Sequence, residues 1–405
     1  MKMRILLMIA LMISLAQNAF AAEYYMSPFG NDSNPGTLAA PWKTMDRLQV
    51  AQAILRPGDT VWFRGGDYML TDSDVNGRYR VLVANVTYKN YSGEVPVIVW
   101  DRVVRRTTHN WMLWLNADSI TIDGLNFRVT ERSRSFGQLP NNGENIKGNG
   151  VVPGGLVTWQ SNGKIRNCSI ENFSVGVGVY GGSNLLVENC KVSGTISHGF
   201  YISAGSGTYR YNSLNGSRAY WNQREIQVQY RLSSRNKIYG NFIANGQAAA
   251  VVFSDGCSGN EFFNNIILNG GSKKETGHGL YGYPLDFNCG NSPNGGPLMG
   301  PGNKAYNNTI IGKSNSGLIA PWWSECGGNR VEIFNNIFYP SSAVPVVQTG
   351  SNIHDNIFYN ITGSVPGGNT MVNPNLVTPN GSTSADAMLQ AGSPARGRGG
   401  GCRRV

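Results

Sequence analysis

The chain has 405 residues, 52 of them glycine, and a formal charge of +10 from 34 lysines and arginines against 24 aspartates and glutamates. No segment after residue 21 is apolar over enough length to span a bilayer, and no nucleic-acid-binding motif occurs, so we expect neither a membrane-spanning nor a nucleic-acid-binding protein. A basic surface attracts acidic polymers such as uronate polysaccharides, although a generally basic surface without a specific partner explains the charge equally well.

The first residues have the pattern of an export signal. Met1 to Arg4 carry two positive charges, Ile5 to Leu15 are almost wholly apolar, and Ala19-Phe20-Ala21 fits a signal-peptidase site. We therefore expect a signal peptide over residues 1–21 and a secreted or periplasmic protein, monomeric and without a membrane anchor. Residues 22–395 are predicted to form a single domain, and the arginine-rich segment 396–405 is predicted to be a disordered basic tail.

Residues 22–66 are predicted to form an N-terminal cap. Apolar residues recur at helical spacing from Met45 to Leu55, and Pro57-Gly58-Asp59 ends this helix before a strand from Thr60 to Arg64. A stack of repeats leaves its first coil exposed, and an amphipathic helix can cover that end. The segment therefore predicts a capping helix at the start of a repeat structure.

A short repeat begins near Asp118, in which a small residue or an asparagine precedes an apolar-rich strand. Five of the eight intervals between these marks are 20 to 28 residues long, which is typical of a parallel β-solenoid with three strands per coil. Such short strands bury an apolar face only by stacking, and asparagine tolerates αL turns and can hydrogen-bond its counterpart on the next coil. The predicted fold is all-β, a parallel β-helix. The marks are Gly124, Asn167, Asn189, Asn212, Asn241, Asn265, Asn308, Asn336 and Asn356.

The longer intervals predict two loops inserted into the coils, Thr130 to Gly154 and Gly271 to Gly302, both rich in glycine, asparagine, proline and serine. Loops that project from a rigid scaffold often wall a binding groove, and mere decoration of the coil is the alternative. Met388 to Ala395 is predicted to close the domain.

Six cysteines in an exported chain permit disulfides. Cys168 and Cys190 fall at the same place in successive repeats, which is consistent with a disulfide between neighbouring coils and equally with two small buried apolar side chains. One pairing among Cys257, Cys289 and Cys326 is also consistent with the sequence. Their spacing does not match a zinc site.

Several of these motifs resemble the secreted right-handed parallel β-helix proteins of the pectate-lyase-like superfamily. The resemblance rests on Tyr24 to Pro28, Asn31 to Gly36, Pro57-Gly58-Asp59-Thr60 and the Asn-x-Ile coils, and covers nearly all of the mature chain. It implies a polysaccharide-active protein, because lyases, glycoside hydrolases, epimerases and binding proteins share the fold. Lyases of this kind cut uronate polymers by β-elimination, often with calcium and a basic lysine or arginine.

The resemblance is incomplete at the site. The paired aspartates with which several pectate lyases hold calcium have no counterpart near His198-Gly199-Phe200. The run Glu225 to Tyr230 is similar to a Glu-Ile-x-x-x-Lys stretch of alginate and dermatan lyases, in which the glutamate binds calcium and the lysine is the base. Glu225 fits this pattern as a calcium ligand, but Tyr230 stands at the lysine position, so a calcium requirement is left open and no other cofactor is implied.

Strand alternation places a candidate binding surface on two neighbouring coils. In the strand His198 to Ser203, Phe200 and Ile202 are expected to face the core, and Tyr201 to face outward. In the preceding coil, Tyr180 follows glycines that are expected to leave a shallow floor. Aromatic rings beside a bare floor suit a sugar, whose apolar face stacks on aromatics. The predicted substrate-binding residues are Tyr180, Gln227, Gln229, Arg231, Lys237, His278, Tyr281 and Trp322.

β-Elimination needs a group that neutralises the uronate carboxylate, a base for the C5 proton and an acid for the leaving oxygen. Arg224 can pair with the carboxylate, His198 can be the base because its ordinary pKa is near neutral, and Tyr201 or Tyr230 can be the acid or the base. His198 as a purely structural residue and Arg224 as half of a surface ion pair with Glu225 are the alternatives. The favoured function is a lyase that acts on an acidic polysaccharide.

Two other functions are open. Hydrolysis needs two carboxyl groups across the scissile bond, and the candidates are Glu225, Asp255 and Asp286, although Asp255 in Ser254-Asp255-Gly256 fits a turn. A glycan-binding or cell-surface protein without catalysis can use the same aromatic face.

Overall fold

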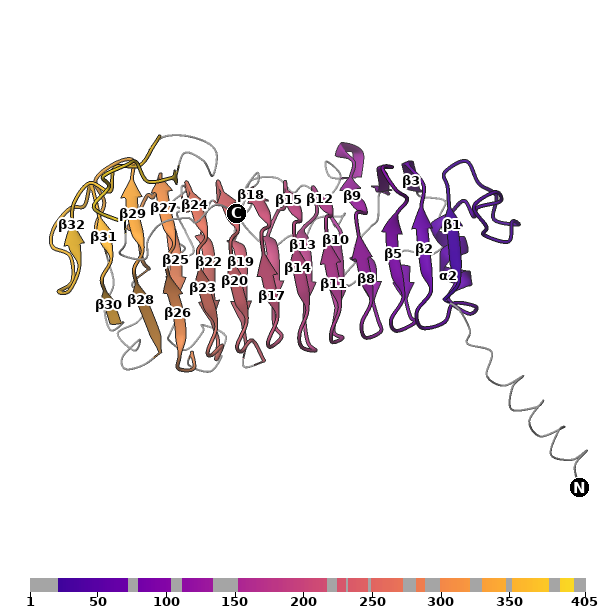
Figure 1. Cartoon of the computed structure of the whole chain (residues 1–405), viewed down its shortest axis with the longest axis horizontal. Coiled ribbons are helices and arrows are strands. Elements are labelled where there is room, and N and C mark those ends of the chain that lie inside the picture. Colours follow the sequence, from indigo (N-terminus) through magenta and orange to yellow (C-terminus); the bar gives the residue numbers. More distant parts are fainter. Residues whose placement is uncertain are drawn as a thin grey trace, which may run out of the picture.

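The computed structural model describes residues 21–71, 79–102, 111–133, 152–216, 224–230, 232–246, 249–271, 282–287, 299–320, 330–346, 352–378 and 387–396. These residues form one long stack of coils that runs from α2 (Met45–Ala51) at one end to β32 (Thr370–Met371) at the other (Figure 1). Each regular coil contributes one strand to each of three sheets, and every strand–strand pairing within these sheets is parallel. The predicted parallel β-helix is therefore confirmed.

The three sheets are named A, B and C, each with its strands in spatial order along the stack. Sheet A contains β1 (Glu23–Met26), β2 (Thr60–Phe63), β5 (Thr87–Asn90), β8 (Thr121–Asp123), β11 (Lys164–Arg166), β14 (Leu186–Glu188), β17 (Thr208–Arg210), β20 (Lys237–Tyr239), β23 (Glu261–Phe263), β26 (Asn303–Tyr306), β28 (Val331–Phe334) and β30 (Asn352–His354). Sheet B contains β3 (Gly66–Thr71), β6 (Pro96–Asp101), β9 (Asn126–Val129), β12 (Ser169–Glu171), β15 (Lys191–Ser193), β18 (Ser213–Asn215), β21 (Phe242–Ala244), β24 (Ile266–Leu268), β27 (Thr309–Gly312), β29 (Ile337–Pro340), β31 (Ile357–Phe358) and β32. Sheet C contains β4 (Tyr79–Val81), β7 (Trp111–Leu115), β10 (Gly154–Thr158), β13 (Val175–Val179), β16 (His198–Ile202), β19 (Arg224–Gln229), β22 (Ala249–Ser254) and β25 (Tyr283–Phe287).

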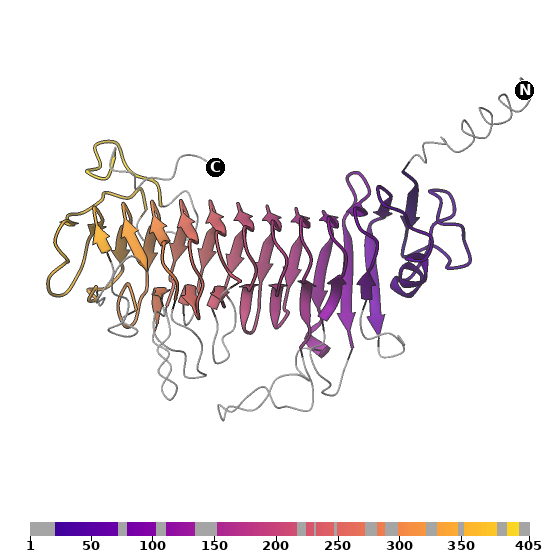
Figure 2. The ribbon, with the colours of Figure 1, turned by 90° about the horizontal axis from the view of Figure 1, so that it is seen from below.

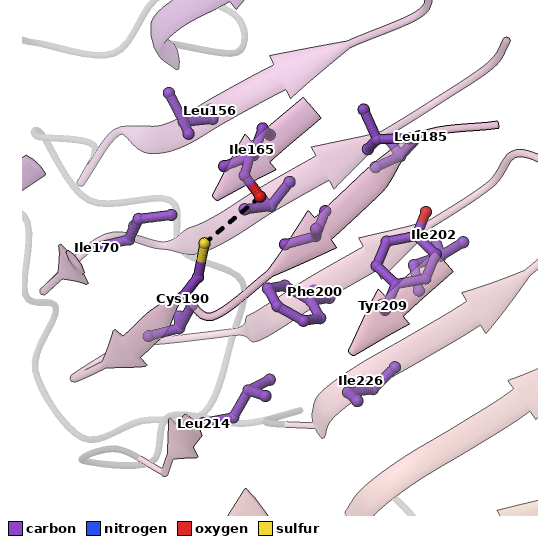
Figure 3. Close-up of a cluster of buried hydrophobic side chains, with 14 of the residues drawn as sticks. Leu156, Ile165, Ile170, Leu185, Cys190, Phe200, Ile202, Tyr209, Leu214 and Ile226 are labelled. Atoms are coloured by element: carbon purple, nitrogen blue, oxygen red, sulfur yellow. Dashed lines mark hydrogen bonds between the residues drawn. The ribbon is translucent and has the colours of Figure 1, made fainter. Parts of the chain in front are cut away.

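The core is a column of apolar side chains that point inward from all three sheets (Figure 3). The short strands bury their middle residue, as at Ile165 and Tyr209, and the longer strands of sheet C bury Phe200 and Ile226. Burying one such side chain stabilises the fold by roughly 1.5–3 kcal/mol. Because no single strand has a partner for this face within its own coil, the stabilisation comes from stacking.

Helix α2 caps the first coils, as predicted, but it ends at Ala51 rather than near Leu55. The Thr44 side chain accepts a hydrogen bond from the Arg47 amide and so satisfies one free N–H group of the first turn. Gln49 and Gln52 accept hydrogen bonds from the backbone amides of Arg80 and Leu82. The helix is thereby fixed to β4, the first strand of sheet C. No helix in the described part of the chain is long and apolar enough to cross a membrane.

A ladder of buried asparagines runs along the turn that precedes sheet B. Each side-chain amide donates to the Oδ1 atom of the asparagine on the next coil at 2.9–3.1 Å. The predicted marks Gly124, Asn167 and Asn189 lie one residue earlier, in a neighbouring column of left-handed backbone with φ of 70°, 56° and 53°. The predicted repeat was therefore out of register by one residue in its first three coils. The ladder consists of Asn212, Asn241, Asn265, Asn308, Asn336, Asn356 and Asn369.

Cys190 continues the asparagine column, since its backbone amide donates to the Asn212 side chain at 2.9 Å. Cys168 occupies the same place one coil earlier, because Ser169 pairs with Lys191. Both thiols are free and buried, and so is Cys257. Of the two alternatives for Cys168 and Cys190, the structure has the small buried side chains; Cys289 and Cys326 lie outside the described residues.

Two other predictions need correction. The expected insertion from Gly271 to Gly302 contains strand β25, which pairs with β22 in sheet C, so it is not a simple loop. The segment from Met388 to Ala395 does not close the last coil. Leu389 packs with Leu376 and Ala387 on the outer apolar surface of sheet B, where Ile266 lies, and the C-terminal segment turns back along the coils in Figure 2.

Candidate functional site

The strands that carry the predicted site are neighbours in sheet C. In the register of β16 and β19, His198 is paired with Arg224, and Tyr201 with Gln227. The inward positions of Phe200 and Ile226 are as predicted. The site therefore lies on the outer face of sheet C, on two adjacent coils.

Four rings form a continuous row on this face, which we call the aromatic row: Trp114, Trp159, Tyr180 and Tyr201. Successive ring centroids are 5.1, 5.3 and 5.1 Å apart, and the ring planes are inclined by 32°, 23° and 31°. Trp159 is 41% exposed. The sequence predicted only the two tyrosines. The signal for Trp114 is its outward position in the strand β7, and Trp159 directly follows β10.

The expected bare floor beside the tyrosines is absent, because Trp111 covers it. A Cβ atom at Gly154 or Gly178 would lie 2.2 or 2.4 Å from the Trp111 ring, so these glycines exist to let the indole lie flat across two strands. Trp111 contacts Tyr180 edge-on, with ring centroids 5.9 Å apart. Gly176 faces the core, where a Cβ would meet Val192. The glycines thus support the aromatic row instead of receiving a sugar.

At the C-terminal end of the row lies a network that we call the polar cluster: His198, Tyr201, Arg224, Gln227, Gln229, Ser254 and Asp255. Arg224 Nη1 donates to Gln227 Oε1 at 2.5 Å, and Gln227 Nε2 donates to Ser254 Oγ at 3.0 Å. Tyr201 Oη donates to Gln229 Oε1 at 3.0 Å, and Gln229 donates in turn to Asp255. Gln227 is 1% exposed and Asp255 3%. Buried polar groups in such a network are held in fixed positions.

Arg224 lies between opposing influences. Burial lowers the pKa of its guanidinium, whereas the negative charges of Asp286 and Asp255 raise this pKa. Asp286 is 6% exposed, and the register places it two strands from Gln227 in the same column, beyond Val252. The predicted carboxylates Asp255 and Asp286 therefore lie close enough to the predicted arginine for their charges to act on it.

His198 is 9% exposed, and its Nδ1 atom lies 3.4 Å from the Arg224 carbonyl oxygen, to which an N–H at that position can donate. Burial, reinforced by the Arg224 charge, lowers the pKa of His198 to about 3. The ordinary near-neutral pKa on which the prediction of His198 as the base rested is therefore lowered at this site. At neutral pH the imidazole is uncharged and a weak proton acceptor.

The tyrosines show the opposite shift. Burial, followed by the hydrogen bond to Tyr230, raises the pKa of Tyr201 well above its ordinary value, and burial raises the pKa of Tyr180 to about 12. Both hydroxyls are consequently protonated at neutral pH. Tyr230 has a φ of 74°, which is unfavourable for a bulky residue, and it is 46% exposed. Such strain is typical of functional sites.

Glu225 does not lie beside Arg224 on the outer face. It is 1% exposed, and a Cβ atom at Gly199 would be 3.3 Å from its Oε2 atom, so the side chain points into the coil. The surface ion pair between the two residues is thereby ruled out. Within the described ranges, no three His, Cys, Asp or Glu side chains gather into a group that could hold a metal. Calcium binding by Glu225 stays a prediction.

Of the other predicted binding residues that the structure describes, Lys237 does not join the cluster. Lys237 is exposed on sheet A, where it pairs with Thr208 and Glu261, and so faces away from sheet C. Arg231, His278, Tyr281 and Trp322 lie outside the described residues.

Residues 24–231 match the family described as the Pel9A-like, right-handed β-helix region. The chain belongs to this family. The resemblance to pectate-lyase-like proteins and the right-handed β-helix are thereby confirmed. No curated protein matches the sequence.

Solved structures with a similar fold differ in function. A rhamnogalacturonan lyase is 17% identical over 87% of this chain and 85% of its own, with a TM-score of 0.45. The GH136 lacto-N-biosidase from Eubacterium ramulus is 14% identical over 83% and 67%, with a TM-score of 0.52. A tailspike protein of E. coli bacteriophage HK620, in complex with a pentasaccharide, is 11% identical over 85% and 64%, with a TM-score of 0.52. At such identities the likeness shows the fold alone.

Proposed function

We propose that the outer face of sheet C binds an acidic polysaccharide and cleaves it by β-elimination. The observation that supports this proposal is the direct connection of the aromatic row to the polar cluster through Tyr201, which belongs to both. Rings provide stacking surface for sugars, and a fixed network of hydrogen-bonding groups orients them for reaction.

Three side chains each perform one part of the proposed reaction. Arg224 binds the uronate carboxylate and so stabilises the negative charge that develops when the C5 proton leaves. Tyr230 acts as the base in its phenolate form and accepts that proton, the C5–H electrons form the C4–C5 double bond, and the C4–O bond breaks. Tyr201, which is kept protonated by its raised pKa, gives its proton to the leaving oxygen. His198 is a neutral hydrogen-bonding partner rather than the base, because its pKa is about 3.

Hydrolysis is the second candidate, favoured by one specific observation. Asp255 and Asp286 are both almost fully buried next to Arg224, and both act on its pKa. A pair of carboxyl groups across a glycosidic bond is what a glycoside hydrolase needs. Binding without cleavage is the remaining alternative, and one assay separates all three.

Purified protein is incubated with polygalacturonate, rhamnogalacturonan, alginate and xylan, with added calcium and with a chelator. The ultraviolet absorbance of unsaturated ends and the yield of reducing ends are followed together. We expect unsaturated ends from at least one uronate polymer. Reducing ends without unsaturation would replace the lyase with a hydrolase, and binding without either product would leave only the glycan-binding function.

A further inference from the structure

The aromatic row continues beyond the residues that the proposed chemistry uses. Along sheet C, Arg80 pairs with Trp114, Trp114 with Val157, Val157 with Gly178, and Gly178 with Tyr201. Arg80, Trp114 and Tyr201 therefore lie in one column, although more than 120 residues of sequence separate the first from the last. The far end of this column is a cation that has no part in the reaction.

Arg80 is exposed and its guanidinium carbon lies 5.4 Å from the centre of the Trp114 ring. This is the geometry of a cation–π contact, which holds the guanidinium over the Trp114 ring. A cation–π contact does not use the N–H donors of the guanidinium, so these can bind other groups. The Arg80 backbone amide donates to Gln49 of the capping helix at 2.7 Å. The cation is thus attached to a rigid part of the fold.

The distance from Arg80 to the polar cluster corresponds to several sugars. From β4 to β19 the chain of strands is β4, β7, β10, β13, β16 and β19, and five strand spacings of ~4.8 Å amount to ~24 Å. An extended pyranose chain advances by a similar distance with each sugar. A chain that runs along the coil axis therefore meets about one strand of sheet C per sugar.

The rings of the row also leave surface for a ligand. Their planes are inclined by 23–32°, and Trp159 is 41% exposed despite its contacts with two neighbouring rings. On sheet A, by contrast, Tyr239, Phe263, Tyr306 and Phe334 are inclined by only 4–13° and none is fully exposed. In the nearly parallel stack of sheet A, each ring face is covered by the neighbouring ring.

We infer that the aromatic row is a run of sugar subsites on one side of the polar cluster, and that Arg80 at its end binds a second carboxylate of the same polysaccharide chain. This inference takes the polar cluster as the place of cleavage, and in that respect it rests on the proposed function. The substrate class that follows is an extended acidic polysaccharide of about five or more sugars.

The test measures how affinity depends on chain length. Oligosaccharides of about two to about eight sugars are prepared from the panel polymer that binds most tightly, because Arg80 and the polar cluster are ~24 Å apart along sheet C. Affinity is taken as KM where the polymer is cleaved and as Kd from calorimetry where it is only bound. We expect the wild-type constant to fall with each added sugar until the row is filled, and to stay level beyond that length.

Two variants then locate the subsites. Trp159→Ala is expected to weaken the binding of long oligosaccharides about tenfold and that of the shortest ones much less, because only the long ones reach this ring. Arg80→Gln should weaken only oligosaccharides that span the whole row, and the loss should shrink at high salt. Phe263→Ala, in the coplanar rings of sheet A, is the matched control and should leave all constants unchanged.

The outcomes separate the two proposals. Length-independent constants, or a Trp159→Ala loss that is equal for short and long oligosaccharides, would overturn the subsites while cleavage at the polar cluster stands. Length dependence without any cleavage would support the subsites and overturn the lyase. If no polymer of the panel is bound or cleaved, both proposals are wrong.

Discussion

The outer faces of sheet A and sheet C carry the same kinds of side chain but arrange them differently. On sheet A the rings of Tyr239, Phe263, Tyr306, Phe334 and His354 stack with centroids 4.8–5.5 Å apart and planes within 13° of parallel. We call this the sheet A ladder. On sheet C the aromatic row has similar spacing but inclined planes, and it leads into buried charges.

The polar groups of the two faces differ even more. The ion pairs of sheet A, such as Arg210 with Glu188 at 2.7 Å and Lys304 with Glu332 at 3.1 Å, are partly exposed and contribute little stability. The polar cluster of sheet C buries Gln227 and Asp255 almost completely. Burying such groups is unfavourable unless every donor and acceptor is matched.

This difference between the two sheets indicates which face of the repeat fold serves a function and not only stability. In-register stacking is the arrangement that identical coils favour, and the sheet A ladder follows it. The aromatic row departs from it, and beside the row Trp111 lies over two glycines and contacts Tyr180 edge-on. The predictions that follow each set a residue of sheet C against a matched residue of sheet A.

Replacing the half-buried Arg224 should have the largest effect. Arg224→Ala removes the cation that binds the uronate carboxylate, so we expect turnover of the acidic polymer to fall at least about 100-fold. Arg210→Ala is the matched variant, because Arg210 bonds Glu188 and Tyr239 on sheet A. It should keep full activity. Equal activity of the two variants would show that the two faces do not differ in function; circular dichroism checks that both are folded.

The tyrosine hydroxyls give the next comparison. Tyr201→Phe keeps the ring in the aromatic row but removes the proton donor, so kcat should fall about 100-fold or more with little change in KM. Tyr306→Phe removes a hydroxyl that donates to Glu261 at 2.6 Å on sheet A, and activity should not change. A Tyr201→Phe enzyme with normal kcat would exclude this hydroxyl as the acid.

The sequence was sufficient to predict the fold and part of the site. Apolar short strands at a recurring interval can be satisfied only by stacking, and alternation within them put Tyr201 outward and Phe200 inward, as the structure has them. The one-residue error at Asn167 and Asn189 arose because two adjacent turn positions both favour asparagine, one for its αL backbone and one for its side-chain ladder.

The rest of the site depends on contacts between residues that are distant in sequence. Trp111 reaches Gly178 across an intervening strand, and nothing in the local sequence indicates this contact. The pKa of His198 depends on how completely neighbouring coils bury it, which composition cannot show. Glu225 was expected to accompany Arg224 because the two are adjacent in sequence, but Glu225 and the next residue, Ile226, are both buried, so the strand departs from simple alternation at Glu225.

The two described histidines of these faces should make opposite contributions to the pH dependence of stability. His198 has a folded-state pKa of about 3, so below pH ~6.5 the unfolded chain takes up a proton that the folded chain does not, and stability falls. His354 has a raised pKa because it bonds Asp355 and Glu332, so its contribution is complete below pH ~6.5 and is lost as the pH rises through the folded-state value.

Chemical denaturation of the wild type and of His198→Gln and His354→Gln at pH 5 and pH 8 tests this contrast. Relative to His198→Gln, the wild type should lose about 2 kcal/mol of unfolding free energy on going from pH 8 to pH 5. Relative to His354→Gln, it should gain stability over the same interval. Differences of the same sign for both variants would contradict the assigned environments.

The smallest effect is expected inside the coils and concerns a polar group with no part in either face. Tyr209 lies in the core beneath sheet A, fully buried against Phe200, and its hydroxyl has no hydrogen-bond partner among the described residues. If buried polar groups are retained on sheet C for function, the Tyr209 hydroxyl in the core, which has no such function, should be dispensable. Tyr209→Phe should therefore raise the unfolding free energy by about 1 kcal/mol and leave activity unchanged. A loss of stability would mean that the hydroxyl is bonded, for example to a buried water molecule, and that burial of an unmatched polar group is not what distinguishes sheet C.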